Sequence, residues 1–320
     1  MSEIDGKLKK LFYSSIGSEF NKCLERSMEC ENKAIKAHSV QNSNVLDLLC
    51  KDGHVIQIKL KVGGDAPPRP EYKLVGRNRA TTFTGLCAEH DSGIFKEIDT
   101  QKISVNDSRQ LYLLAYRSVL RELHATMHGA GMIQGAYQER VEMGIDPKDQ
   151  PSNASMEAVF HMIKAWRTYR YRCKFDRIEE SDCYEELAHF TKVLATKAPT
   201  IAASVLFGVG KYSTEEDLVG VALNIVPLSA NQTVVVFSYL KEHENEVKSA
   251  YPELYQAEGY YLGYVVSKLL LEYGENLVLC PEYYNSWSEE KRACILEYFT
   301  KTLLEEQHEK DNEHLFLFQM

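Results

Sequence analysis

The sequence predicts an α+β fold with a small zinc-stabilised module at the N-terminus, a helical middle and a C-terminal antiparallel sheet with helices. Three observations support this prediction. Metal-binding side chains with ligand-like spacing lie in the first third of the chain, two long segments with helical periodicity follow, and three runs rich in β-branched residues come after residue 197. We therefore expect the chain to divide into residues 1–105, 106–190 and 191–320.

Composition is ordinary for a globular protein. At 320 residues the chain is long enough for two domains, and its 44% apolar and 26% charged residues suit a buried core. The formal net charge of −9 argues against electrostatic coating of nucleic acid, but it leaves room for a local basic groove. The start, MSEIDGKLKK, lacks the features of a secretory signal, and no apolar run reaches the roughly 18 residues of a spanning helix. We expect a cytoplasmic protein that does not enter a membrane.

The first predicted element decides which cysteines can share a metal ion. Apolar residues near helical spacing predict a helix from about Ile4 to Cys30, and this helix would include Cys23. Within one helix the two sulfur atoms would lie two turns apart, on the order of 10 Å by helical rise. That separation is too large for two ligands of one tetrahedral zinc ion. Shared ligation therefore requires the helix to break between Cys23 and Cys30.

A second pair of metal-binding residues has the spacing Cys87-x2-His90. Such a step is typical of a zinc ligand pair at the start of a helix. Cys30 would be a third ligand, and either Cys23 or His38 the fourth. Without a secretory signal disulfides are not expected, so metal ligation or burial must account for these thiols. The alternative is that Cys87 and His90 only pack at the start of the helix.

Periodicity predicts the elements between the first ligands and residue 190. The segment HVIQIKLKV (54–62) alternates with period two and should form a strand, with which the segment before Cys87 pairs back. Residues 106–143 have helical periodicity, and Asp107 can cap the start of that helix. A second long helix is expected from about Ser155 into Arg172, with an extension past Glu180 as the longer alternative.

The second helix carries the segment KAWRTYRYRCKFDR, which mixes cations with aromatic rings. Such cations could neutralise phosphates while the rings stack on bases, and this predicts a contact with nucleic acid. The four candidate cations are Arg167, Arg170, Arg172 and Lys174. Acidic residues follow directly, from Asp176 to Asp182, so pairing within the chain is an equally good explanation.

The C-terminal part should contain a sheet and several helices. The runs PTIAASVLFGV, LVGVALNIVPL and TVVVFSYL are rich in β-branched residues and predict three strands. Their connections, KYSTEED and SANQ, are short enough for antiparallel neighbours. Helices are expected at about 241–250, 259–273 and 288–306, with a strand at 276–281 between the last two.

Two segments, AHSVQ (37–41) and FTGLCAEHD (83–91), resemble a group of uncharacterised bacterial proteins with AHS-x-Q and FxGxCxxHD segments. The resemblance covers roughly residues 20–125 and carries no known activity. In the order of its elements the region is also distantly similar to the treble-clef zinc modules of HNH endonucleases. The chain departs from that pattern at three places: Ala37 stands where a second His or an Asp is usual, Thr82 replaces an Asn, and Cys23-x6-Cys30 replaces a CxxC pair.

The resemblance to HNH endonucleases implies metal-dependent hydrolysis of phosphodiester bonds in DNA or RNA, in the context of defence against mobile DNA. His38 would be the base that activates water, and Asp91 would hold a Mg²⁺ or Mn²⁺ ion. The ligands of a structural zinc ion would be Cys23, Cys30, Cys87 and His90. The competing hypothesis is a non-catalytic, zinc-stabilised binding or assembly protein that recognises a protein or a small ligand. The acidic net charge and the absent second histidine favour this alternative.

Overall fold

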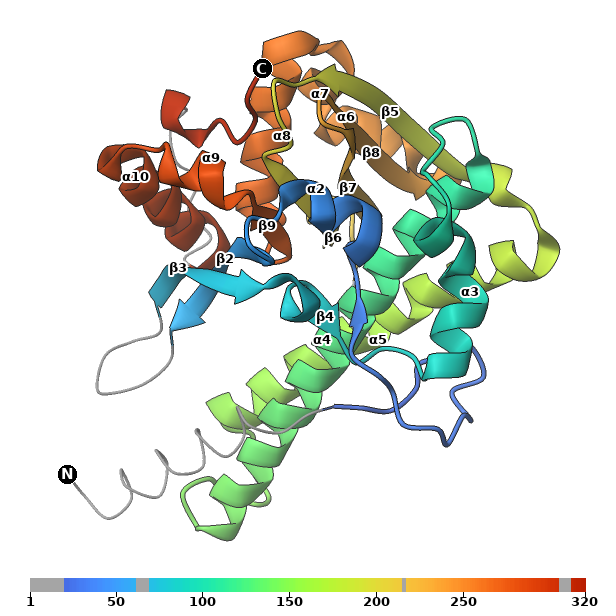
Figure 1. Cartoon of the computed structure of the whole chain (residues 1–320). Coiled ribbons are helices and arrows are strands. Elements are labelled where there is room, and N and C mark those ends of the chain that lie inside the picture. Colours follow the sequence, from blue (N-terminus) through green and yellow to red (C-terminus); the bar gives the residue numbers. More distant parts are fainter. Residues whose placement is uncertain (1–19, 62–68, 215–216, 305–311) are drawn as a thin grey trace.

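The computed structural model describes residues 20–61, 69–214, 217–304 and 312–320 (Figure 1). At its centre lies a seven-stranded sheet in the order β3-β2-β9-β6-β7-β8-β5, and all neighbouring strands are antiparallel. The strands are β2 (His54–Lys61), β3 (Arg69–Gly76), β5 (Leu187–Ala195), β6 (Ile201–Gly208), β7 (Gly220–Ser229), β8 (Gln232–Leu240) and β9 (Leu277–Leu279). The prediction of an α+β fold with an antiparallel sheet is thereby confirmed.

Helices cover both faces of this sheet (Figure 1). One face packs against α4 (Ser108–Glu142), which in turn packs against α3 (Ala88–Thr100) and α5 (Asn153–Ser181). The other face is covered by α6 (Glu244–Ala250), α7 (Pro252–Gln256), α8 (Gly259–Tyr273), α9 (Pro281–Asn285) and α10 (Glu289–Phe299). In β6, Ala202 and Leu206 belong to the first core and Ala203 and Val205 to the second, as the alternation of strand side chains requires. Both faces of β6 are therefore buried.

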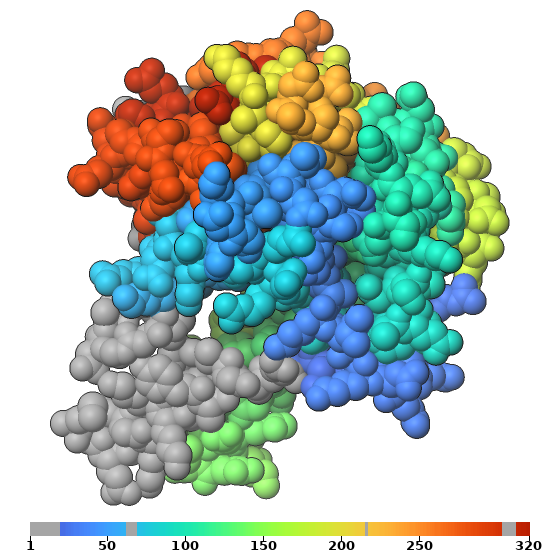
Figure 2. Space-filling view, viewed as in Figure 1, coloured from blue at the N-terminus to red at the C-terminus, as the bar shows by residue number. Residues whose placement is uncertain are grey.

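The N-terminal segment contributes a separate pair of short strands. β1 (Ala37–His38) and β4 (Thr82–Phe83) are antiparallel, with Ala37 opposite Phe83. A helical turn (Asn42–Leu46) and α2 (Asp47–Leu49) lead from β1 into β2. Figure 2 shows this segment, in blue and cyan, between the orange C-terminal helices and the teal surface that includes α3.

Most elements expected from periodicity are present. The helix predicted over 106–143 is α4, and the side chain of Asp107 caps it by accepting a hydrogen bond from the Gln110 N–H. The strand at 54–62 and the three later runs are β2, β6, β7 and β8. The periodicity does not predict β5, an edge strand of nine residues that pairs along its length with β8.

No helix in the described ranges has both the length and the apolar character needed to cross a bilayer.

The sheet crosses the expected divisions at residues 105 and 190. β2 and β3 belong to the first predicted part, yet they lie in the same sheet as the C-terminal strands. β9 makes the link, because Leu279 pairs with Ile56 of β2 and with Ile201 of β6. In the described part of the chain, residues before 105 therefore do not form a module apart from the C-terminal sheet.

Buried hydrogen bonds fasten the AHS-x-Q segment to the rest of the fold. Ser39 Oγ donates to the Thr81 carbonyl at 2.8 Å and accepts from Asn276 Nδ2 at 2.7 Å. Gln41 Nε2 donates to the Asp99 carbonyl, near the end of α3, at 2.8 Å. Ser39 and Gln41 are both buried, and buried polar groups need such partners. These two residues of the segment thus position β1 against α3 and the sheet.

Candidate metal centre

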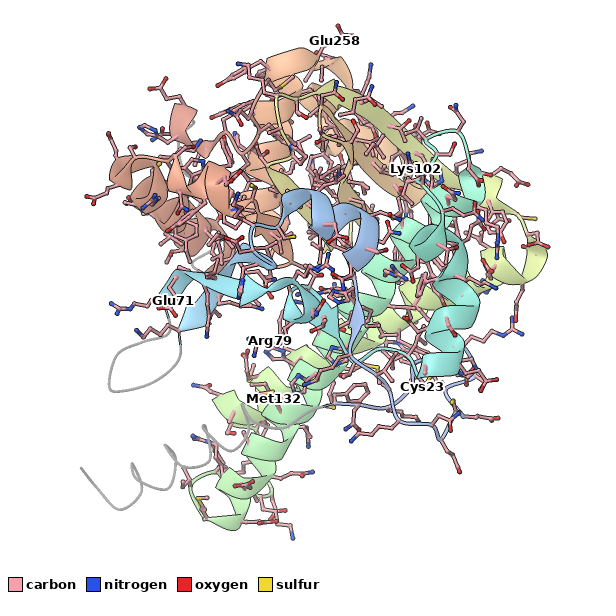
Figure 3. All side chains as sticks on the ribbon, viewed as in Figure 1. Cys23, Glu71, Arg79, Lys102, Met132 and Glu258 are labelled. Atoms are coloured by element: carbon pink, nitrogen blue, oxygen red, sulfur yellow. The ribbon has the colours of Figure 1, made fainter. Side chains whose placement is uncertain are left out.

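Four side chains from two segments converge beside the first turn of α3. The ligand atoms of Cys23, Cys30, Cys87 and His90 all lie within 4.8 Å of one another, and we call these four residues the Cys/His centre. Within the described ranges, no other three or more His, Cys, Asp or Glu side chains lie close enough to share an ion. Cys23, labelled in Figure 3, lies at the base of α3.

The separations between these atoms fit a tetrahedral ion of the size of zinc. His90 Nδ1 lies 3.4 Å from Cys23 Sγ and 3.3 Å from Cys87 Sγ. Zinc–sulfur bonds of about 2.3 Å and zinc–nitrogen bonds of about 2.05 Å, meeting at the tetrahedral angle, place the two ligand atoms about 3.6 Å apart. Three cysteines and one histidine are also a common donor set for this metal. The Cys/His centre could therefore bind a metal ion such as zinc.

The prediction of a helix through Cys23 and Cys30 is wrong over the described residues 20–30. Because this segment is not helical, both sulfur atoms can reach one centre. The segment is a loop whose two arms are joined by an antiparallel bridge between Lys22 and Lys33. Met28 has a φ of 60°, in the left-handed region that a right-handed helix excludes. The rest of the predicted helix, residues 4–19, lies outside the described residues.

Glu25 gives a physical reason for the loop. Its carboxylate accepts hydrogen bonds from the backbone N–H groups of Ser27 (3.0 Å), Glu29 (3.1 Å) and Cys30 (3.3 Å). Burial acts to raise the pKa of Glu25, but a hydrogen bond from the Ser27 hydroxyl and these three backbone bonds outweigh it and lower the pKa to about 2. A side chain that satisfies neighbouring N–H groups competes with helix formation. The hydrophobic period carried no sign of this competition.

The second ligand pair begins α3, with Cys87 at the N-cap position. The Cys87 N–H donates to Cys23 Sγ at 3.2 Å, and the Leu24 N–H donates to the Gly85 carbonyl at 2.7 Å. A Cβ at Gly85 would lie 2.3 Å from the ring of Phe83, so a larger residue would push the two apart. The ligand loop and the segment before α3 are thus held together by backbone bonds as well as by the ligands.

The thiols of the Cys/His centre differ in acidity. Burial raises the pKa of Cys23 to about 11. Burial also acts to raise the pKa of Cys87, but a hydrogen bond from the His90 N–H and bonds from neighbouring thiols lower it to about 7. The N-terminus of α3 favours negative charge in the same place. Cys87 therefore loses its proton more readily than Cys23.

His38 lies outside the Cys/His centre. Its Nδ1 is 2.9 Å from the Ala80 carbonyl, so a proton on Nδ1 leaves Nε2 without one. Burial lowers the pKa of His38, and the charge of Arg117 adds to this effect. Burial raises the pKa of Asp91, in the first turn of α3. The Ala80 carbonyl is therefore the group that orients the His38 ring.

An ion pair that the sequence did not indicate acts electrostatically on both His38 and Asp91. Arg117, whose side chain is only 3% exposed, donates two hydrogen bonds to the Asp99 carboxylate, at 2.8 and 2.7 Å. Its guanidinium also lies 4.1 Å from the centre of the Phe95 ring. Both His38 and Asp91 are within the electrostatic range of this pair. Because the two partners come from different helices, no local spacing revealed them.

Arg172, a predicted phosphate contact, is completely buried, and the prediction is wrong for this residue. Its Nη2 donates to the Leu24 carbonyl at 3.0 Å, and its Nε lies 3.0 Å from the Asp176 carboxylate. Asp176 in turn accepts a hydrogen bond from the Tyr116 hydroxyl at 2.7 Å. Arg172 therefore connects α5 to the residue that follows Cys23.

The other three predicted cations lie nearer to the surface. Lys174 Nζ lies 2.8 Å from carboxylates of both Asp217 and Glu242, so pairing within the chain occupies it. Arg167 donates to a backbone carbonyl of the β6–β7 connection at 2.8 Å. Arg170 is exposed. These four side chains thus do not form one basic surface.

Comparison with known proteins identifies no relative: no family model, curated protein or solved structure matches this chain. The resemblance to HNH endonucleases accordingly stays a prediction from the sequence.

Proposed function

We propose that this chain is a non-catalytic, zinc-stabilised binding protein whose Cys/His centre holds a structural zinc ion. The closed donor set carries the proposal, because four protein ligand atoms within 4.8 Å leave no position for water or a substrate. Catalytic zinc sites keep such a position open. When bound, the ion would contribute to folding, since its ligands are not gathered in the unfolded chain.

The order of the elements supports a treble-clef-like arrangement around the ion. One ligand pair, Cys23 and Cys30, comes from a loop; the β1–β4 pair follows; the other ligands come from the start of α3. β2 and β3 are inserted between β1 and β4 and extend the main sheet. Zinc would therefore stabilise the point where the N-terminal segment, α3 and α5 meet.

Metal content tests the proposal directly. We expect about one zinc ion per chain, by elemental mass spectrometry, in protein purified without chelator. The variant Cys87→Ser should lose the ion and unfold at a lower temperature. Cys183→Ser is the matched control, because Cys183 is partly buried but lies outside the Cys/His centre. Absence of zinc from the wild-type protein, or equal zinc in both variants, would contradict the proposal.

A second candidate function is the metal-dependent hydrolysis of DNA or RNA, and the geometry of His38 favours it. The bond between Nδ1 and the Ala80 carbonyl orients the ring, and the lowered pKa keeps Nε2 available as a base near neutral pH. Asp91 follows the ligand His90 directly and could hold a Mg²⁺ or Mn²⁺ ion, which commonly binds through one or two carboxylates. Defence against mobile DNA would suit this activity.

The variant His38→Ala separates the two candidates, because it leaves the Cys/His centre intact. A nuclease would show cleavage of DNA or RNA with added Mg²⁺ or Mn²⁺, and the variant would lose at least about 100-fold of it, as expected for a general base. A binding protein would show no cleavage with either chain. Zinc content and thermal stability, measured on the same samples, would establish that the variant is folded.

A further inference from the structure

A large cavity lies apart from the Cys/His centre. It is lined by α4, α5 and the C-terminal end of β6. Its volume is about 800 Å³, within the usual size of small-molecule sites. The remaining walls come from the β6–β7 connection, the C-terminal end of α8 and Thr302. A Cβ added at Gly129 of α4 or at Gly210 would meet nothing within 4 Å, so the backbone leaves this space open.

One wall of the cavity carries three basic side chains, and the carboxylate of Glu122 on α4, which also lines the cavity, acts electrostatically on one of them, Lys164. His161, Lys164 and Arg167 recur every three residues on α5 and line the same side. Arg167 is held by its bond to the Thr214 carbonyl, while its Nε is buried without a hydrogen-bond partner among the described residues. Lys164 is exposed. These side chains can place two positive charges on an anion that enters the cavity.

A second wall of the cavity offers acceptors and an aromatic surface. Glu272 and Glu275 line the cavity from the end of α8 and the residues just beyond it. Between them in sequence, Tyr273 stacks on Phe207 with ring centres 4.4 Å apart. Carboxylates in this position repel a second anion, but they accept hydrogen bonds from hydroxyl or amino groups. A ligand that suits both walls is therefore anionic at one end only.

The geometry points to a free nucleotide as the ligand of this cavity, with its phosphates on Lys164 and Arg167 and its sugar or base near Glu272 and Tyr273. A nucleic-acid strand fits less well, because its regular phosphates would need a continuous basic track, whereas the carboxylates of Glu122, Glu272 and Glu275 also line this cavity. The inference names a ligand class for the binding protein proposed above and rests on that proposal.

Isothermal titration calorimetry of the full-length protein with ATP, GTP, UTP and CTP tests the inference. We expect micromolar affinity for at least one of these nucleotides. The matching nucleoside should bind at least tenfold more weakly, and a single-stranded oligonucleotide of 12 nucleotides should not bind more tightly than the free nucleotide. The double variant Lys164→Gln, Arg167→Gln should weaken nucleotide binding by at least tenfold. Arg170→Gln, an exposed change on the same helix outside the cavity wall, should leave it unchanged.

A second variant tests the space itself. Gly129→Leu should fill part of the cavity and reduce binding, while the better helix propensity of leucine helps to preserve α4. Failure of all four nucleotides at millimolar concentration would overturn the inference, as would binding that neither variant weakens or tighter binding of the oligonucleotide. Zinc content measured in the same samples keeps this failure distinct from failure of the proposed zinc centre.

Discussion

Replacement of Arg172 by methionine should destabilise the protein strongly, because the arginine side chain is completely buried and its partners are buried with it. The change removes the partner of a buried carboxylate, Asp176, and the donor to the Leu24 carbonyl. Breaking a buried ion pair from one side costs about 3–5 kcal/mol, because the remaining charge stays buried without compensation. At roughly 2 °C per kcal/mol for a chain of this size, the melting temperature should fall by about 6–10 °C.

The double variant Arg172→Met, Asp176→Asn supplies the control. Asparagine carries no charge but can still accept the hydrogen bond of the Tyr116 hydroxyl, so about half of the lost stability should return. Urea denaturation monitored by circular dichroism measures both variants. The penalty of the single variant should also shrink between pH 7 and pH 5, because burial already raises the pKa of Asp176 and loss of the arginine raises it further. A cost below about 1 kcal/mol at pH 7, with no dependence on pH, would refute this account.

Three further predictions concern other buried or half-buried groups. Asn276→Ala should cost about 2–3 kcal/mol in urea denaturation, since it removes hydrogen bonds to the Ser39 hydroxyl and to a carbonyl of β6, both 2.7 Å long; an unchanged midpoint would contradict the role of Asn276 in fastening β1. Gly220→Ala should cost about 1–3 kcal/mol, because the new Cβ would lie 2.7 Å from the buried Tyr171 ring; relief of that cost by Tyr171→Leu would support the cause. Burial lowers the pKa of His189 to about 4, so its neutral form contributes stability above pH 6.5 that is lost as the pH falls towards 4. His189→Gln should therefore flatten the pH dependence of stability in this window. A ring that titrates near pH 6.5 by NMR would contradict this prediction.

Local signals predicted most of the secondary structure. α4 follows from helical periodicity that begins at the Asp107 cap, and β6, β7 and β8 follow from runs of β-branched residues with short connections. The Cys87-x2-His90 step likewise predicted the start of α3 and half of the Cys/His centre. In each case the information lies within a few residues of the element that it specifies.

Local sequence patterns did not predict the pairing between strands that lie far apart in the chain. β9 lies between β2 and β6 because Leu277–Leu279 pair with β6 while Leu279 also pairs with Ile56 of β2, a strand far away in the sequence. Three residues carry almost no periodic signal of their relation to His54–Lys61. The expected boundary at residue 105 rested on the ligand spacing before it and the helical periodicity after it, and neither records which strand edge receives which partner.

The most instructive error concerns polar residues, because their count and their direction carry different information. KAWRTYRYRCKFDR is rich in cations, which favoured a nucleic-acid contact; yet a helix distributes them over all its sides, and Arg172 points inward while Arg170 is exposed. The spacing of Arg172 and Asp176, four residues apart, was the local sign of an internal pair. Glu25 is the same case in a loop: its carboxylate gathers three N–H groups and thereby brings Cys30 to Cys23. An internal partner for a charged side chain can therefore decide where the chain turns, and with it which metal ligands meet.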